Sequence, residues 1–156
     1  MSVARTIAIR TAIVLGLSGP VVGYYEGMVP STYADPVGIP TICYGHTGPD
    51  VQWGDTRTAE QCEALKQSDM QAALGGVLRC TGPQLADHEY AALVSFTYNV
   101  GGTAYCNSTM AQQINAGAPA AVWCAQLDRW VYDKGIKLPG LVKRRAAERA
   151  LCEGRA

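Results

Sequence analysis

The chain has few of the residues that metal-binding proteins and nucleic-acid-binding proteins require. It contains two histidines, and none of its six cysteines forms a Cys-x-x-Cys pair, so a metal site of ordinary zinc-ligand spacing is not expected. Its formal net charge is zero, which gives no sign of the basic surface that nucleic-acid binding needs. No internal repeat, low-complexity tract or linker divides residues 24–156. We therefore expect one monomeric domain with a short N-terminal attachment and no cofactor, metal or nucleic-acid partner.

The N-terminal segment lacks the length of a comfortable membrane-spanning helix. Arg5 and Arg10 make a basic start, and residues 11–23 then carry no charge over thirteen positions, short of the roughly 20 that such a helix needs. A cleaved signal peptide, a weakly apolar signal anchor and a buried core helix all fit this pattern. We expect residues 1–23 to be an uncleaved export-directing segment that packs on a folded domain of residues 24–156.

Cysteine, in contrast, is abundant for a cytosolic chain of this size. The six cysteines are even in number and separated by long, fairly regular gaps. This pattern indicates three disulfides and an oxidising compartment. Free buried cysteines are the alternative.

The order of predicted elements indicates an α+β fold. Residues 29–54 are rich in Gly and Pro and predict a loop with a small hairpin or meander, after which the chain reads as helical. Thr58 and Gln61 make a capping box that opens a helix through about Arg79. Asp87 and Ser108 are predicted to cap the next two helices, which end near residues 101 and 117. Pro119 and Pro139 are predicted to begin two more, which end near residues 135 and 154. A small β lobe followed by a helical lobe leaves a cleft between the two.

Neighbouring elements in this order favour one pattern of disulfides. Six cysteines permit many pairings, but a bond between consecutive elements joins each cysteine to the next one along the chain. The expected pairs are Cys43–Cys62, Cys80–Cys106 and Cys124–Cys152.

Two carboxylates and a hydroxyl follow the apolar segment at suggestive spacing. Eight residues separate Glu26 from Asp35, and five separate Asp35 from Thr41. Glycosidic bonds are hydrolysed by one acid that protonates the leaving oxygen and a second carboxylate that attacks or activates water. Glu26 is expected to end an apolar helix beside buried rings, in apolar surroundings that would suit it to be the acid. Asp35, in a wetter Pro/Gly loop, would stay ionised, and Thr41 would hold a water. Helix caps or surface charges are the alternative, because the chain has thirteen acidic residues.

The wider motif resembles that of a known enzyme family. Glu26, Asp35 and Thr41 at this spacing, followed by Gly45-His46-Thr47, resemble the signature of the phage lysozymes of glycoside hydrolase family 24. The resemblance continues in the family's order through residues 58–61, 95–101, 107–109, 129–130 and 139–145. It therefore spans residues 24–153 with near-family spacing.

The resemblance implies a lysozyme-like two-lobed fold and N-acetylmuramidase activity. The substrate would be the β-1,4 bond between N-acetylmuramic acid and N-acetylglucosamine in bacterial peptidoglycan. By analogy with the family, Glu26 is the general acid, and Asp35 with Thr41 positions or activates the water. Such enzymes are inverting, so the two carboxyl groups are expected to stand about 6.5–9.5 Å apart. One departure is Cys43, where the family commonly has glycine, which suggests that a disulfide is accommodated there.

The apolar N terminus and the extra cysteines resemble one branch, the signal-arrest-release endolysins of double-stranded DNA phages. Their N-terminal anchor is rich enough in Gly and Ala to leave the bilayer. The resemblance implies export by the host secretion machinery, an inactive form tethered to the inner membrane, and a soluble periplasmic form. Residues 1–42 contain no cysteine, so control by disulfide exchange inside the anchor is not expected. Release would instead let residues 11–23 fold onto the domain and complete the site.

Further residues are candidates for supporting or substrate-binding roles. His46 either supports the hairpin and Glu26 or acts as a base, and Asn99 either contacts sugar amides or caps its helix. His88 is expected at the surface. The complete set of supporting candidates is His46, Asn99, Trp130 and Arg144.

Two patterns near the C terminus have both a structural and a functional interpretation. Trp123 and Trp130, seven residues apart, are expected on one helix face in the core, with Trp130 partly lining the cleft. The basic run Lys143-Arg144-Arg145 is either a solvated helix face or a surface that attracts an anionic polymer.

Two other functions would fit parts of this pattern. A lytic transglycosylase would use one essential acid and would not need Asp35 or Thr41. A non-catalytic peptidoglycan-binding module would not need the Glu/Asp/Thr set at all. The complete set therefore favours the hydrolase.

Overall fold

The structure is a computed structural model that describes residues 3–155, except for the side chains of residues 4, 5 and 9. Residues 1–2 of the predicted export segment and the side chain of Arg5 lie outside this part. The helices are α1 (Val3–Glu26), α2 (Ala59–Cys80), α3 (Asp87–Val100), α4 (Gly102–Cys106), α5 (Thr109–Asn115), α6 (Ala120–Cys124), the 3-10 helix η1 (Ala125–Arg129) and α7 (Pro139–Cys152). The strands are β1 (Val29–Ala34), β2 (Pro40–Cys43), β3 (His46–Thr47), β4 (Tyr132–Asp133) and β5 (Ile136–Lys137).

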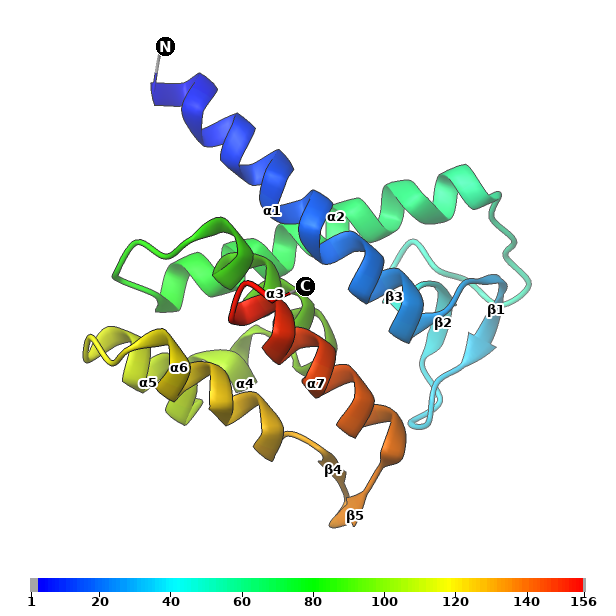
Figure 1. The fold of residues 1–156 in the computed structure, drawn as a ribbon. Coiled ribbons are helices and arrows are strands. Elements are labelled where there is room, and N and C mark those ends of the chain that lie inside the picture. Colours follow the sequence, from blue (N-terminus) through cyan, green and yellow to red (C-terminus); the bar gives the residue numbers. More distant parts are fainter. Residues whose placement is uncertain (1–2, 156) are drawn as a thin grey trace.

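Helix α1 is continuous across the expected boundary at residue 23. One face of its second half packs mainly on α3, burying Val14, Leu15, Ser18 and Val22, whereas its first turns project from the body (Figure 1). The stretch Thr6–Glu26 spans 21 residues, and its most apolar 18-residue window has a mean hydropathy of 1.5, so it is long and apolar enough by composition to cross a membrane. This stretch is longer than the uncharged run, because the helix includes Arg10 and continues through Glu26. The division at residue 23 stays a prediction.

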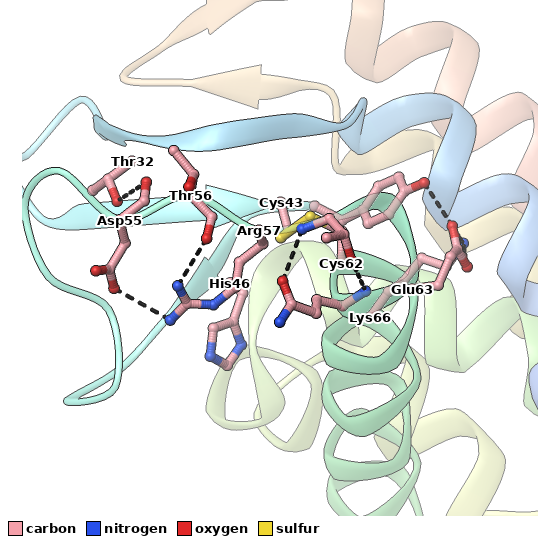
Figure 2. The surroundings of a disulfide bond; sticks show 12 residues. Thr32, Cys43, His46, Asp55, Thr56, Arg57, Cys62, Glu63 and Lys66 are labelled. Atoms are coloured by element: carbon pink, nitrogen blue, oxygen red, sulfur yellow. Dashed lines mark hydrogen bonds and ion pairs between the residues drawn. A yellow bond between two sulfur atoms is a disulfide. The ribbon is translucent and has the colours of Figure 1, made fainter.

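The β lobe is the small antiparallel meander that the Gly/Pro-rich stretch predicts. Its strands lie in the order β1-β2-β3 beside the C-terminal end of α1 (Figure 1). Figure 2 shows the lobe fastened to α2 by the Cys43–Cys62 disulfide at the end of β2. A second fastening is the Tyr98 hydroxyl, which donates to the Tyr44 carbonyl oxygen at 2.7 Å. The lobe is thereby held in place against the helices.

The backbone at Cys43 has a conformation that favours glycine, the residue that is common at this position in the family. Its φ is +61°, in the left-handed region that side chains other than glycine rarely adopt. Cys43 is fully buried and bonded to Cys62. The chain therefore keeps the hairpin geometry with a cysteine, and the disulfide accompanies the left-handed residue.

The helical lobe is built around α3, whose residues 90–97 are all buried. Helices α1, α2 and α7 pack against it. The expected start signals are largely confirmed: the Thr58–Gln61 capping box opens α2, Ser108 caps α5, and Pro139 begins α7. Disulfides join Cys80 to Cys106 and Cys124 to Cys152, so all three expected pairs are present.

The predicted fourth helix is wrong beyond Cys124. The chain tightens into η1 and then forms the β4–β5 hairpin, which lies below α7 in Figure 1. Lys134 and Gly135 have φ values of +46° and +79°, the pair of positive angles typical of a two-residue hairpin loop, and such angles cannot continue a helix. Trp123 and Trp130 consequently do not share one helix face. Trp123 is buried, and Trp130 stacks edge-on against Phe96.

Two predictions at the start of α3 are also corrected. The N-cap is Ala86 rather than Asp87, and Glu89 accepts from the Ala86 backbone N–H at 2.7 Å. Asp87 is left to bind Arg10 of α1, with 2.8 Å between Arg10 Nε and Asp87 Oδ1. His88 is partly buried rather than exposed, because its Nδ1 lies 3.1 Å from the Cys152 carbonyl oxygen.

Candidate active site

Glu26 is the last residue of α1 and lies where the two lobes meet. Gly27, with φ of +69°, ends the helix as a left-handed glycine whose N–H binds the Gly23 carbonyl. A carboxylate at a helix C terminus faces the negative end of the helix dipole. Arg144 of α7 offsets this, since its Nη1 donates to Glu26 Oε1 at 2.6 Å. The Glu26 side chain is 20% exposed, and its partner is a guanidinium rather than the apolar surroundings expected.

Arg144 belongs to a buried network of alternating charges. Its Nε donates to Glu148 Oε1 at 3.0 Å and its Nη2 to the Ser95 carbonyl at 3.2 Å. Arg145 donates from Nη1 to Glu148 Oε2 at 2.6 Å. Ser95 Oγ donates to Glu148 Oε1 at 2.8 Å. Glu26, Arg144, Glu148 and Arg145 thus form a row of two acids and two bases in which every charge has an opposite neighbour.

Both interpretations of the basic run are therefore wrong for Arg144 and Arg145. Their exposed fractions are 3% and 1%, so they form neither a solvated face nor a surface for an anionic polymer. Burial raises the pKa of Glu148, and Arg145 and Arg144 oppose that rise. Burial lowers the pKa of Arg145, which Glu148 counteracts. Glu148 was not predicted from the sequence. It lies four residues after Arg144 and three after Arg145, and this spacing allows ion pairs along a helix.

Asp35 and Thr41 are tied to the same residue, Ile39. Asp35 Oδ1 accepts from the Ile39 backbone N–H at 2.8 Å and from that of Val37 at 2.9 Å. The Thr41 hydroxyl donates to the Ile39 carbonyl at 3.0 Å, and the same carbonyl accepts from the Asp35 N–H at 3.0 Å. The turn between β1 and β2 therefore fixes the carboxylate and the hydroxyl relative to each other. The part played by Ile39 could not be predicted, because it acts through its backbone.

A cavity of about 280 Å³ lies beside Glu26. Gly45 belongs both to its wall and to the surroundings of the acid, since a Cβ placed there would lie 3.5 Å from Glu26 Oε2. The cavity runs between the β2–β3 turn, one face of α2 and the end of α3. Its lining is Gly45, Thr47, Asp69, Ala72, Ala73, Gly76, Arg79, Thr97, Tyr98 and Gly102. This is the cleft expected between the lobes.

His46 has a structural position and pairs with two aspartates. Its Nδ1 lies 2.8 Å from Asp69 Oδ2 on α2, and its Nε2 lies 3.2 Å from Asp50 Oδ2. Burial acts to lower its pKa, but the hydrogen bonds and charges of Asp69 and Asp50 outweigh it and raise the pKa above the ordinary value. His46 of β3 is therefore tied to α2 through Asp69, and the described contacts of its ring do not include Glu26. Its supporting role stays a prediction.

Asn99 and Trp130 lie in different settings. Asn99 accepts a hydrogen bond from Arg145 and so extends the charge network; the cap at the end of α3 is Gly101 instead. Trp130 packs edge-on against Phe96 with ring centroids 5.0 Å apart. It also lines a second cavity of about 270 Å³ together with Ser108 and Arg129.

Comparison with known proteins places this geometry in a family. The sequence profile of the phage lysozyme family matches residues 23–148. A SAR-endolysin of bacteriophage PS119 is 36% identical over 146 residues, covering 94% of this chain and 86% of that protein. The muramidase domain of SpmX from Asticaccaulis excentricus superposes with a TM-score of 0.79 at 28% identity, covering 90% of this chain and 94% of that domain.

The endolysin Lyz of phage P1 shares the fold at lower identity. Its active form has a TM-score of 0.78 at 24% identity, covering 95% of this chain and 93% of that one. Its secreted inactive form reaches 0.58 at 23% identity, with 91% and 94% covered. The lysozyme-like α+β fold is thereby confirmed. Because the family profile covers most of the chain and a relative well above 30% identity covers nearly all of it, the chain belongs to the phage lysozyme family and is a glycoside hydrolase.

Proposed function

We propose that the chain is an endolysin with muramidase activity, which hydrolyses the β-1,4 bond between N-acetylmuramic acid and N-acetylglucosamine in bacterial peptidoglycan for host lysis. The observation that carries the proposal is the Glu26 carboxylate, held at 2.6 Å by Arg144 beside a cavity of about 280 Å³. Family membership supplies the reaction class. The site is assembled within one chain, in keeping with action as a monomer.

Glu26 is the general acid that protonates the leaving glycosidic oxygen. One of its oxygens is bound by Arg144, and the other lies toward Gly45, whose missing side chain leaves room for the substrate. A general acid needs to be within hydrogen-bond reach of the atom that it protonates. The short ion pair holds Glu26 at a fixed place on the cleft wall, which lowers the cost of orienting it in the transition state.

Asp35 and Thr41 position and activate the attacking water. Asp35 Oδ1 is occupied by two backbone N–H groups, and in residues 3–155 no hydrogen bond uses Oδ2. The Thr41 hydroxyl gives its proton to the Ile39 carbonyl, so its lone pairs point elsewhere and can accept a hydrogen bond from water. A water bound by both would attack the face opposite the leaving group, giving inversion with the carboxyl groups about 6.5–9.5 Å apart.

Two measurements test this assignment. Glu26→Gln is expected to abolish the clearing of purified cell walls in a turbidity assay while the protein still binds the walls; normal clearing would remove Glu26 from its role. Product analysis separates the reaction classes. A reducing end of inverted anomer is expected, whereas an anhydro-sugar would identify a lytic transglycosylase, and binding without any product would identify a wall-binding module.

Helix α1 is proposed to hold the enzyme inactive in the inner membrane before release into the periplasm. It is long and apolar enough to span, and among its described side chains several large apolar or aromatic ones remain exposed on the folded domain: Val3, Ile7, Ile13, Leu17 and Tyr24. Glu26 is the last residue of the same helix. While α1 lies in the bilayer, Glu26 cannot pair with Arg144 in a formed cleft, so the site is complete only after release.

A further inference from the structure

Arg79 of α2 is an arginine without a partner at the cleft wall. Among residues 3–155, no hydrogen bond or ion pair involves its side chain. Seven other arginines in this part of the chain each donate to a protein acceptor, namely Arg10, Arg57, Arg129, Arg144, Arg145, Arg149 and Arg155. The exception lines the cavity beside Glu26.

The Arg79 guanidinium lies against a backbone surface made by two glycines. A Cβ at Gly102 would be 3.6 Å from Arg79 Nη2, and a Cβ at Gly76 would be 3.7 Å from the same atom. The two glycines face each other where α2 meets α4, since the Gly76 Cβ would also lie 3.5 Å from Gly102 Cα. The charged end of an otherwise exposed side chain therefore rests on the cavity wall.

A second polar group of the same cavity also lacks a partner. Thr97 is 2% exposed, and its hydroxyl has no hydrogen-bond partner in the described residues. A buried hydroxyl without a partner carries a desolvation cost that a bound polar group can relieve. Thr97 lines the cavity with Arg79 and packs close to Gly76. This end of the cleft thus offers unused polar groups.

The two charged side chains that line the cavity, Asp69 and Arg79, differ in whether they have an ion-pair partner. Asp69 is already paired with His46, whereas Arg79 is free. The two residues are ten positions apart on α2, a rise of about 15 Å along the helix. A polymer that extends from Glu26 along α2 therefore meets an unpaired cation at the far end.

We propose that Arg79 binds a carboxylate of the stem peptide on the glycan strand in the cleft and so sets the preference for peptide-bearing strands. In an intact strand the lactyl group of muramic acid is amide-linked, so the negative charges are the carboxylates of the stem peptide. A guanidinium matches a carboxylate with two parallel N–H donors. The inference rests on the proposed muramidase function and names Arg79 as a specificity-determining residue.

Soluble glycan strands with and without charged stem peptides test this role. One half of a strand preparation is treated with carbodiimide and methylamine, which converts the carboxylates to neutral amides. Reducing ends are then measured against strand concentration for the wild type, Arg79→Gln and Arg79→Lys. Arg155→Gln, at an exposed arginine of the C terminus, is the matched control.

On untreated strands Arg79→Gln is expected to raise KM by about two- to fivefold with kcat changed less, the size of one exposed charge pair. Arg79→Lys should lie between it and the wild type, and Arg155→Gln should match the wild type. On amidated strands the wild type and Arg79→Gln should have the same KM, because the partner charge is gone. Added salt should narrow the difference on untreated strands.

Other outcomes overturn the proposal in distinguishable ways. An equal loss for Arg79→Gln on both kinds of strand would mean that Arg79 contacts the sugars or supports the fold. An unchanged KM on untreated strands would leave it no part in binding. If the wild type released no reducing ends from either preparation, the muramidase function itself would fail, and this inference with it.

Discussion

Arg144 Nη1 lies 2.6 Å from Glu26 Oε1, joining the last residue of the first helix to a residue 118 positions later in the last helix. The same guanidinium also holds Glu148 and the Ser95 carbonyl. The proposed catalytic acid is thus positioned by the core of the helical lobe. Because Glu26 ends the apolar helix, we expect this ion pair to form only when that helix is packed on the domain.

Replacing Arg144 should reduce both stability and activity. Arg144→Gln leaves Glu148 with one fewer buried partner and leaves Glu26 unpaired, and breaking a buried pair costs about 3–5 kcal/mol. We expect a loss of that size in the free energy of unfolding by urea titration, and a loss of wall clearing at temperatures where the variant is folded. The control is Arg149→Gln on the same helix, a half-buried arginine whose ion pairs lie outside this network. Its replacement should cost much less stability than that of Arg144, because ion pairs near the surface are weak, and should leave wall clearing unchanged. Wild-type stability for Arg144→Gln would contradict the network.

The pairing of His46 should make stability depend on pH. The folded state raises the pKa of His46 through Asp69 and Asp50 against the opposing effect of burial. A raised folded-state pKa means that the stabilisation is complete below the unfolded value near 6.5 and is lost as the pH rises through the folded-state pKa. The free energy of unfolding should therefore fall as the pH rises from about 6.5 through the folded-state pKa.

Urea titrations across that pH range measure this slope. Asp69→Asn removes the charge that faces His46 Nδ1 and should flatten the slope by lowering stability mainly on the acidic side. His46→Gln should do the same. A slope that survives both substitutions would have to come from another group.

The Cys43–Cys62 disulfide should stabilise the β lobe in spite of the backbone at Cys43. Its 19-residue separation corresponds to about 3 kcal/mol in the loop-entropy account. The left-handed backbone at Cys43 costs a side chain about 1 kcal/mol. Cys43→Ser with Cys62→Ser should therefore lose about 3 kcal/mol, and Cys43→Gly with Cys62→Ser about 1 kcal/mol less than that. Thermal and urea unfolding of the two double variants decide the order; equal losses would show that the left-handed angle carries no cost.

Arg10 should favour release from the membrane. It lies within the 21-residue apolar stretch, where a cation is unfavourable, and on the folded domain it binds Asp87 and the Leu85 carbonyl. Arg10→Leu strengthens the span, an exchange worth about 3 kcal/mol at a helix centre and less near an end. We expect more protein in the membrane fraction and later lysis.

Asp87→Asn is the matched control for this test, because it weakens the same ion pair without changing the apolar helix. Fractionation of expressing cells should show membrane retention for Arg10→Leu and near-normal partitioning for Asp87→Asn. Equal partitioning of Arg10→Leu and the wild type would remove Arg10 from the release step.

The sequence predicted those features that are decided by local chemistry. The capping box at Thr58, the Ser108 cap and Pro139 place helix starts correctly, because each satisfies or removes backbone groups within a few residues. The order of elements was enough to predict the three disulfides. The spacing of Glu26, Asp35 and Thr41, together with the motifs after it, predicted the family and the enzyme class.

Tertiary structure decided what depends on contacts between distant segments. The helix after Pro119 ends at Cys124, and the chain then turns at Lys134 and Gly135 in a hairpin that leads into α7, which packs on α3; local propensity did not reveal this path. Arg144 and Arg145 look solvated in the sequence, but packing of α7 against α1 and α3 buries them beside Glu26, Ser95 and Glu148. The residues at the site could be read from local spacing, whereas the partners that hold their charges in place come from segments that only the fold brings together.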